Sequence, residues 1–331
     1  MAPLRWGIIA PGSIAHKFAE ALDALPEAEL VAVGSRSLDR AKEFAAKYGA
    51  GRAYGSYEDL VSDDEVDAVY VANPHNYHRD SVVLCLEHGK AVLCEKPLAV
   101  SAREVQVMID AARRNRVFLM EAMWTRFLPV WQKVRSWIDE GAIGDVRIVN
   151  GTFGFRSAWN PEGRLLNPHL AGGGLLDVGI YLTAMAYWVT RREPVDVVSA
   201  THLGETGVDE QAAFVLKYED GALASLTCSV RTTTRHVALI YGTEGWIEVP
   251  HMFWNTTEAT LHRDGEEDVV FSEPFIRNGF EYEVREAGEC IATGRLESPI
   301  LPLDESLQIV RTLDAVRAQA GLVYPFERED A

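Results

Sequence analysis

Short apolar runs alternate with amphipathic stretches along the first third of the chain. The runs are rich in Val, Ile and Leu, as buried strands are, and the stretches between them repeat apolar residues at helical spacing. Alternation of this kind predicts an α/β fold with a doubly wound parallel sheet. The expected strands are 4–10, 30–33, 66–72, 92–94 and 117–120, and the expected helices are one ending at 25 and those over 39–48, 81–88 and 101–116.

Beyond residue 122 the pattern changes, and alternating, half-buried strands follow one another along the chain. Strands in series predict an α+β domain with a large, mainly antiparallel sheet that carries helices on one face. We therefore expect a dinucleotide-binding domain over residues 1–122 and a substrate-binding and oligomerisation domain over residues 123–331. The strands expected in the second domain are 145–155, 197–202, 209–218, 222–231, 236–241, 246–250 and 259–262, and its helices are 129–140, 175–189, 280–293 and 304–320.

A sheet with helices on only one face leaves the other face open. Self-association is the simplest way to cover such a face. We expect a homodimer or a larger homo-oligomer built through the open sheet face.

The chain has 331 residues, 47% hydrophobic and 24% charged, which is the composition of an ordinary globular protein. A net charge of −17 argues against nucleic acid or an anionic membrane as a partner, so an anionic cofactor would need a local positive pocket. No run approaches the roughly 18–20 apolar residues of a membrane span, and the start lacks the features of a signal peptide, which favours the cytoplasm. The cysteines show no metal-ligand spacing, and we expect core thiols and no bound metal.

The turn after the first strand has the features of a phosphate-binding turn. Aligned on G-x-G-x-x-G/A, its small positions are Ala10, Gly12 and Ala15, and a helix follows from about Ser13 and Ile14. The amides and the dipole of a helix N-terminus favour the pyrophosphate of a dinucleotide. Only Gly12 is glycine, and turns of small residues are common in any βα unit. The pattern alone is therefore weak support for a cofactor held by residues 10 and 12–14.

The end of the second strand bears on which dinucleotide is bound. An NAD site would carry Asp or Glu about 20 residues past the turn, to hold the ribose 2′-hydroxyl. This chain has Ser35 and Arg36 there, and an arginine can pair with a 2′-phosphate and stack on adenine. We therefore expect NADP, with NAD less favoured. The alternative is that Arg36 only covers the surface of the following helix.

A polar loop over residues 73–78 follows the third strand and falls at the cofactor edge of the expected sheet. It contains Asn73, His75 and His78. We expect all three to bind or line the cofactor, although the histidines can instead have a structural role.

Glu95, Lys96 and Pro97 end the strand that begins at Val92. Lysine is almost never fully buried without a partner, so Lys96 should face a cleft at the ligand-binding edge of the sheet. The alternative is a surface turn after an edge strand. A cis Lys96–Pro97 peptide is a further expectation at this position.

Three glycines at 172–174 precede an apolar helix that carries Asp177 and Tyr181. Their i, i+4 spacing predicts that the two side chains share one helix face, a turn apart. A tyrosine beside an ammonium such as that of Lys96 is a plausible proton donor to a carbonyl oxygen, and Asp177 could orient the pair. Alternatively, Asp177 favours the dipole at the helix start and Tyr181 belongs to the core.

The Gly12 turn, the Glu95-Lys96-Pro97 strand end and the helix after Gly172 together resemble the glucose–fructose oxidoreductase/inositol dehydrogenase (Gfo/Idh/MocA) family, essentially from end to end. The longer stretches 118–127 and 205–209 are similar to the branch that contains dihydrodiol and D-xylose dehydrogenases. Many members carry histidine where this chain has Tyr181, whereas that branch carries tyrosine. The resemblance implies an N-terminal Rossmann domain and NADP-dependent hydride transfer.

The same resemblance implies roles for individual residues. Lys96 and Tyr181 would act at the reacting oxygen with support from Asp177, and Glu95, Lys96, Trp124 and Arg126 would contact the cofactor. The implied walls of the substrate pocket are Trp124, Phe153, Trp159, Trp254 and Phe280. Residues 156–169 depart from the family pattern, which leaves the substrate open.

Three functions follow as expectations. The first is hydride transfer between NADP and a CH–OH group of a cyclic sugar or a trans-dihydrodiol. The second is reduction of a keto-sugar or nucleotide-sugar by NADPH. The third, a non-catalytic NADP-binding sensor or scaffold, is disfavoured by the intact set of Lys96, Asp177 and Tyr181.

Overall fold

The computed structural model describes residues 2–329. By residue contacts the chain divides into two compact units, residues 1–127 with 275–307 and residues 128–274 with 308–331. The sequence indicated one boundary near residue 122, with all later residues in the second domain. The structure differs because the helix α8 (Glu281–Ala292) packs on α1 (Ser13–Asp23) of the first unit. The ion pair between Arg285 and Glu27, 2.8 Å long, belongs to this packing.

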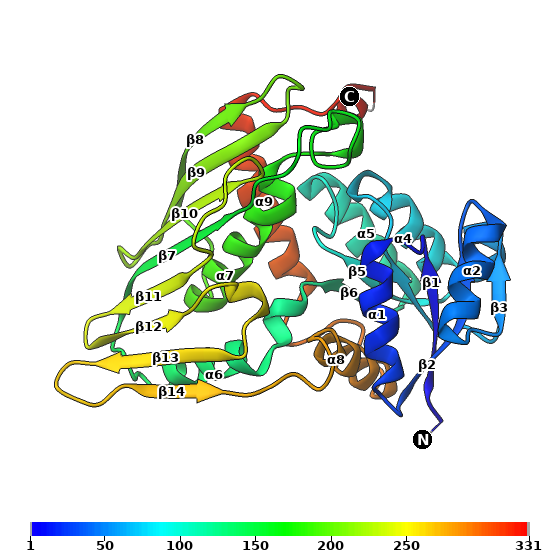
Figure 1. Cartoon of the computed structure of the whole chain (residues 1–331), viewed down its shortest axis with the longest axis horizontal. Coiled ribbons are helices and arrows are strands. Elements are labelled where there is room, and N and C mark those ends of the chain that lie inside the picture. The colour runs from blue at the N-terminus through cyan, green and yellow to red at the C-terminus, as the bar shows by residue number, and fades with distance from the viewer. Residues whose placement is uncertain (1, 330–331) are drawn as a thin grey trace. The chain divides into compact units, whose positions relative to one another are not determined.

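The first unit contains the parallel sheet that the alternating pattern predicted. Its strands lie in the order β3-β2-β1-β4-β5-β6, and every neighbouring pair is parallel (Figure 1). The order reverses between β1 and β4, which is where open α/β sheets bind their ligands. The strands are β1 (Leu4–Ile9), β2 (Ala28–Gly34), β3 (Arg52–Tyr54), β4 (Ala68–Val71), β5 (Ala91–Glu95) and β6 (Leu119–Ala122). The helices are α1, α2 (Leu38–Tyr48), α3 (Tyr57–Val61), α4 (His78–Glu87), α5 (Ala102–Asn115) and α8.

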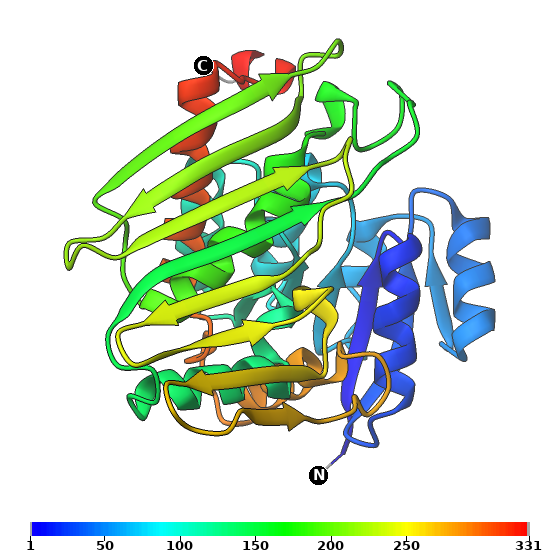
Figure 2. The ribbon, with the colours of Figure 1, turned by 60° about the vertical axis from the view of Figure 1, so that its left-hand side comes forward.

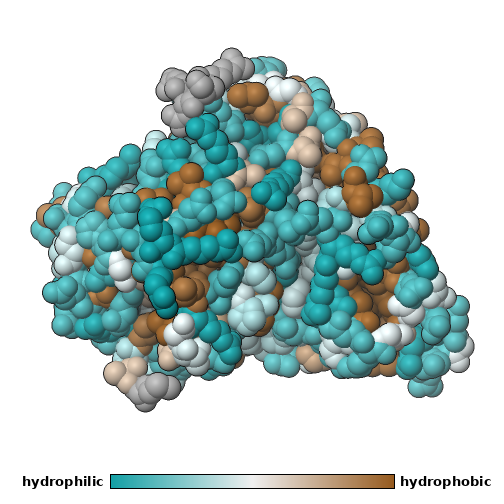
Figure 3. Space-filling view, turned by 180° about the vertical axis from the view of Figure 1, so that it is seen from behind, coloured by the Kyte–Doolittle hydropathy of each residue, from teal (hydrophilic) through white to brown (hydrophobic). Residues whose placement is uncertain are grey.

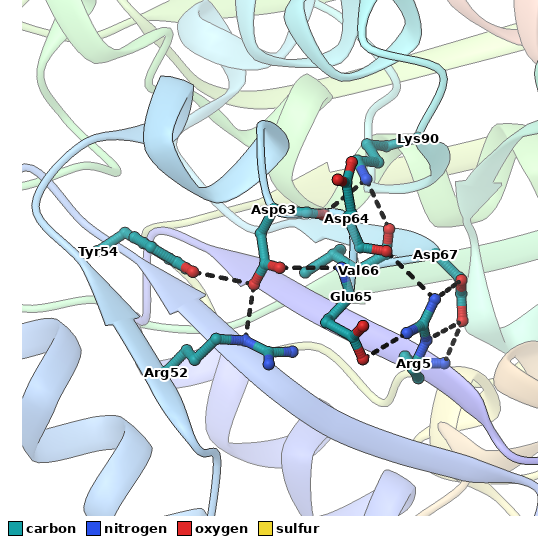
Figure 4. A network of polar contacts seen from close by, with 9 residues as sticks. All are labelled: Arg5, Arg52, Tyr54, Asp63, Asp64, Glu65, Val66, Asp67 and Lys90. Atoms are coloured by element: carbon teal, nitrogen blue, oxygen red, sulfur yellow. Dashed lines mark hydrogen bonds and ion pairs between the residues drawn. The ribbon is translucent and has the colours of Figure 1, made fainter.

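A polar network fixes the edge of this sheet at which β1, β4 and β5 begin (Figure 4). The guanidinium of Arg5 binds the carboxylate of Asp67 through Nη2 at 2.7 Å and through Nε at 2.9 Å. Lys90 Nζ donates to the carbonyl oxygens of Asp63, at 2.7 Å, and Val66, at 2.8 Å. The carbonyl oxygen of Asp63 also accepts the amide of Val66, at 3.1 Å, so Lys90 adds a second donor there and satisfies the carbonyl of Val66. Lys90 thereby holds the loop before β4 against the start of β5.

The second unit is built on an eight-stranded sheet in the order β14-β13-β12-β11-β7-β10-β9-β8. All neighbouring pairs are antiparallel except β7 with β10, which confirms the predicted mainly antiparallel sheet. The strands are β7 (Val146–Gly154), β8 (Asp196–Leu203), β9 (Asp209–Lys217), β10 (Leu223–Ser229), β11 (Ala238–Gly242), β12 (Gly245–Val249), β13 (Glu258–Arg263) and β14 (Val269–Ser272).

Helices cover one face of this sheet. Figure 2 shows the eight strands in front of α6 (Pro129–Asp139) and α7 (Ile180–Thr190), and these helices contact β13, β14, β7 and β10. The rest of the helical part is α9 (Leu303–Ala320) and the short α10 (Pro325–Glu329). The outward face stays open, as expected, and carries an apolar stripe that crosses four adjacent strands. Its members are Val198, Val215, Leu223 and Ile148, each at least 38% exposed.

One apolar segment corrects the expectation that no run approaches the length of a membrane span. Residues Pro168–Thr190 are long and apolar enough to cross a membrane by length and composition alone. The structure buries 94% of the apolar window inside the protein, as it would a core helix. Figure 3 shows one face of the protein, on which teal hydrophilic residues surround smaller brown hydrophobic areas.

Candidate active site

The turn between β1 and α1 has room for a phosphate. Ala10 adopts φ 62°, and the amide of Gly12 donates to the carbonyl oxygen of Ala10 at 2.7 Å. A Cβ atom built on Gly12 would meet only that carbonyl oxygen, at 3.8 Å, so the space in front of the helix is open. The first turn of α1, which begins at Ser13 and Ile14, contains no acidic residue. An anion is therefore compatible with the free amides of this helix start.

At the end of β2 the side chains of Ser35 and Arg36 have different surroundings. Ser35 is buried, and its Oγ accepts the amide hydrogen of Ser37 at 3.2 Å. Ser37, not Arg36, caps α2. Arg36 is exposed, and its guanidinium lies 5.8 Å from the centre of the Tyr77 ring. A cation beside an aromatic ring at this edge fits the adenosine end of a dinucleotide better than simple cover of a helix surface.

The loop after β4 is organised by His78 and Asn73. The buried ring of His78 bridges the carbonyl oxygens of Asn73, at 2.8 Å, and Pro97, at 2.9 Å, and burial lowers its pKa. His78 thus has the structural role that the sequence left open, and it joins this loop to the end of β5. His75 is buried beside it, with ring centres 5.8 Å apart.

Asn73 retains an unused acceptor at the same edge of the sheet. Its Nδ2 donates to Ser81 Oγ at 2.7 Å. Its Oδ1 is buried, and among residues 2–329 it has no hydrogen-bond partner. Buried polar atoms are usually satisfied, so this oxygen fits a donor group supplied by a cofactor.

Lys96 follows an inner strand of the sheet, because β5 is hydrogen-bonded to both β4 and β6. The alternative of a surface turn after an edge strand is therefore wrong. The Lys96–Pro97 peptide is cis, as expected. Glu95 anchors the strand end, since its carboxylate accepts the hydroxyl of Tyr70 and, at 3.1 Å, the amide of Lys96. The carboxylate of Glu95 is therefore engaged in hydrogen bonds within the protein.

Two further acids are buried near this strand end, and the sequence did not single them out. Glu283 of α8 is fully buried, and within the described part of the chain neither of its carboxyl oxygens has a hydrogen-bond partner. Burial and the nearby Glu95 and Glu281 raise its pKa well above the usual range. Burial also raises the pKa of Glu121 to about 7. In the sequence, α8 has an ordinary amphipathic pattern, which gave no sign that Glu283 faces inward.

The two residues expected beside the nicotinamide, Trp124 and Arg126, have different surroundings. Trp124 stacks on Phe280 with ring centres 4.8 Å apart, which brings together two of the expected pocket residues. Arg126 is instead turned inward, with its side chain only 2% exposed. It donates to Glu305 at 2.5 Å and to the carbonyl oxygen of Ile300 at 3.3 Å. This arrangement favours a structural role for Arg126 over the predicted cofactor contact.

In the second unit the expected helix begins with a π-helical turn, η4 (Leu175–Gly179), before α7. The turn is held by Asp209, whose buried carboxylate accepts the amide of Leu175 at 2.6 Å. Gly173 has φ 127°, and a Cβ there would lie 2.0 Å from Asp209 Oδ1, so glycine is required. The expected α-helical spacing of Asp177 and Tyr181 is thus modified by wider π-helical winding, a feature frequent at functional sites.

Asp177 has a partner that sequence reasoning missed. Arg164 Nη2 donates to Asp177 Oδ1 at 2.9 Å. The side chain of Asp177 is 11% exposed and that of Arg164 is 44% exposed. No local pattern signals this pair, because Arg164 belongs to an irregular loop.

Aromatic rings gather beside Tyr181. Phe153 lies 5.5 Å from the Tyr181 ring and stacks on Trp254 at 3.6 Å, measured between ring centres. Phe153 is buried, so Trp254 is the more exposed ring of the stack. Trp159 is not part of this group. It is 48% exposed, with the guanidinium of Arg231 lying 5.3 Å from its ring centre.

Comparison with known families agrees with this arrangement. Residues 4–123 match the profile described as oxidoreductase family, NAD-binding Rossmann fold, and residues 131–248 match the GFO/IDH/MocA C-terminal domain. The chain belongs to the Gfo/Idh/MocA family. This confirms the resemblance, and the protein is an oxidoreductase with an NAD(P)-binding Rossmann fold.

Individual relatives of this Gfo/Idh/MocA member are similar over nearly their whole length. Trans-1,2-dihydrobenzene-1,2-diol dehydrogenase is 38% identical in Mus musculus and 39% identical in Homo sapiens, over 98% of this chain and 99% of each relative. The aldose-aldose oxidoreductase of Caulobacter crescentus has a TM-score of 0.88 and 26% identity, covering 99% of this chain and 98% of that one.

A 3-ketoreductase from Actinomadura kijaniata, solved with NADP and TDP-benzene, has a TM-score of 0.85 and 27% identity, covering 96% of this chain and 97% of that one. Structures of that enzyme were also solved with a lysine replaced by alanine or glutamate, and with a tyrosine replaced by phenylalanine.

Proposed function

We propose that this protein is an NADP-dependent dehydrogenase that transfers hydride between NADP and a CH–OH group of a cyclic sugar or a trans-dihydrodiol. The observation that carries the proposal is the intact set of Lys96, Asp177 and Tyr181 in a chain similar end to end to dihydrodiol dehydrogenases. The aromatic stack beside Tyr181 supports it, because such rings suit the apolar face of a cyclic substrate.

Each proposed role follows from the chemistry of the side chain. When bound, the nicotinamide cofactor supplies the hydride chemistry. Tyr181 exchanges the proton of the substrate hydroxyl, and Lys96 stabilises the oxyanion that develops there. Asp177 orients the polar groups around Tyr181. The Gly12 turn holds the pyrophosphate.

Substitution of Lys96 and Tyr181 tests these roles. Lys96→Met and Tyr181→Phe should each lower kcat by about 10²–10⁴-fold, the typical contribution of acid–base catalysis, while NADPH affinity stays within about twofold. Tyr187→Phe is the matched control on the same helix, because its hydroxyl already contacts Gln308 and Thr312. Turnover is followed by NADPH absorbance across aldoses, inositols and trans-diols. Wild-type turnover by either active-site variant would refute the proposal.

Preference for NADP over NAD is part of the proposal. Arg36 beside Tyr77 supports it, because a guanidinium can pair with a 2′-phosphate that NAD lacks. Arg36→Ala should weaken NADPH binding about 10- to 100-fold and leave NADH binding nearly unchanged. Equal loss for both nucleotides in calorimetry would contradict this preference.

One observation favours a second candidate, reduction of a keto-sugar or nucleotide-sugar. A similar chain of known structure is a 3-ketoreductase solved with NADP and TDP-benzene. NADPH consumption with keto-sugars, in the absence of alcohol oxidation, would support this candidate. Cofactor binding without turnover of any substrate would instead support a sensor or scaffold.

The proposed assembly is a homo-oligomer formed through the open face of the eight-stranded sheet. The apolar stripe of Val198, Val215, Leu223 and Ile148 supports it. Val215→Glu should shift the mass measured by light scattering toward the monomer, whereas Val107→Glu, an exposed valine on α5, should not. A monomeric wild-type protein would refute this assembly.

A further inference from the structure

We propose that Arg164, together with Asp177, binds two adjacent hydroxyl groups of the substrate, which makes Arg164 the residue that selects a diol over a mono-alcohol within the proposed substrate class. The inference rests on the proposed function, because it assigns the substrate side of the same site. It concerns the segment between β7 and the glycines 172–174, which carries Arg164.

The segment that carries Arg164 is packed firmly against the start of the π-helical turn. The carbonyl oxygen of Leu165 accepts the amide of Gly173 at 2.9 Å, and that of Asn167 accepts the amide of Gly172 at 3.0 Å. A Cβ on Gly172 would lie 2.8 Å from the carbonyl oxygens of both Arg164 and Leu165. Leu166 is buried. Backbone packing therefore fixes where the Arg164 side chain begins.

The ion pair itself is of little value for stability. Because the Arg164 side chain is 44% exposed, solvent screens its pairing with Asp177, and such a pair adds little to the free energy of unfolding. Within residues 2–329, the contact of Nη2 with Asp177 is the only hydrogen bond of this guanidinium. Its other N–H groups remain as donors on a half-exposed side chain, next to the turn that leads to Tyr181.

This pair has the chemistry that recognises a diol. A guanidinium presents several donors in a rigid plane, and a carboxylate presents acceptors, so the pair can match hydroxyl groups that both donate and accept. The two charges cancel, and an anionic substrate would have to compete with Asp177 for Arg164. The stacked rings of Trp254 and Phe153 beside Tyr181 offer an apolar surface to the ring of the same substrate.

A site built to bind a substrate hydroxyl discriminates strongly against the analogue that lacks it. The test compares binding of trans-1,2-cyclohexanediol, a cyclic vicinal diol, with that of cyclohexanol, which lacks the second hydroxyl, by calorimetry on the NADPH-saturated protein. The wild type should bind the diol about 10- to 100-fold more tightly. Arg164→Ala should lose most of this preference, and Arg164→Lys, which keeps the charge without the planar fork, should recover part of it. Arg156→Ala, an exposed arginine of the same segment, should retain it.

A second variant tests whether the position of the Arg164 guanidinium matters for diol binding, apart from its charge. Gly172→Ala forces the Arg164 segment away from the turn while it keeps the guanidinium, and it should reduce the diol preference as Arg164→Ala does. Equal weakening of both ligands, or an unchanged preference in Arg164→Ala, would overturn the proposal. Because the readout is binding, a protein that selects the diol but oxidises no alcohol would support this inference and refute the proposed dehydrogenase activity.

Discussion

Asp209 makes the stability of the protein depend on pH in a way that one substitution can reveal. Its carboxyl group is buried at the start of β9 and accepts the amide of Leu175 at 2.6 Å. Burial raises the pKa of Asp209 from 3.8 to about 7, although hydrogen bonds from backbone amides oppose the rise. The group is thus an acid that the folded state prefers to keep protonated.

The direction and size of the effect follow from linkage. An acid with a raised pKa in the folded state stabilises the fold fully below its unfolded pKa, and this contribution is lost as the pH rises through the folded value. Each pKa unit corresponds to about 1.4 kcal/mol, so ionisation of Asp209 costs about 4 kcal/mol by the time the pH exceeds about 7. Asp209→Asn keeps an oxygen for Leu175 and does not ionise. The variant should therefore gain about 4 kcal/mol relative to the wild type between about pH 4 and pH 8.

Urea unfolding followed by tryptophan fluorescence across this pH range measures the difference directly. Asp196→Asn, at an exposed carboxylate on the neighbouring strand β8, is the matched control and should show no comparable trend. The reasoning fails if the free-energy difference between Asp209→Asn and the wild type is flat with pH. It also fails if the wild type becomes the more stable protein as the pH rises.

Three further outcomes are expected. Gly12→Ala should change the free energy of unfolding by no more than about 0.5 kcal/mol, because φ at Gly12 is −92° and the space around an added Cβ atom is open. The same variant should weaken NADPH binding at least about tenfold in calorimetry. Lys90→Met should destabilise the protein by about 1–3 kcal/mol in urea, since the carbonyl of Val66 loses its donor and that of Asp63 loses one of two, and an unchanged midpoint would contradict this. Trp254→Ala should lower kcat/KM for cyclic substrates about tenfold in the NADPH assay, and Trp159→Ala should have a smaller effect.

Local patterns were sufficient for most of the fold. Strands such as β1, β4 and β5 are apolar runs whose burial on both faces is visible in their composition, and the alternation of helices between them predicts the parallel sheet. The edge at which open α/β sheets bind their ligands follows from that topology, and it predicts Gly12, Asn73 and Lys96 as cofactor-site residues.

What the sequence did not reveal depends on contacts between distant residues or on short elements. β3 has only three residues, too few for a periodic pattern, and β14 is a mostly exposed strand at the edge of its sheet, without the buried residues of β4 or β6. The orientation of Arg126 toward Glu305 and the burial of Glu283 arise from residues 275–307 joining the first unit, which no local pattern indicates.

The discontinuity of the first unit has a consequence for biosynthesis. When the ribosome has made residue 127, the parallel sheet is complete, but α8 is still about 150 residues away. At about 5–20 residues per second, the nascent sheet waits roughly 7–30 s for its last helix, with the α8-facing side of α1 uncovered. A fragment that stops at residue 127 should therefore be prone to aggregation. To express the cofactor-binding unit alone, residues 275–307 should be joined to it by a designed linker.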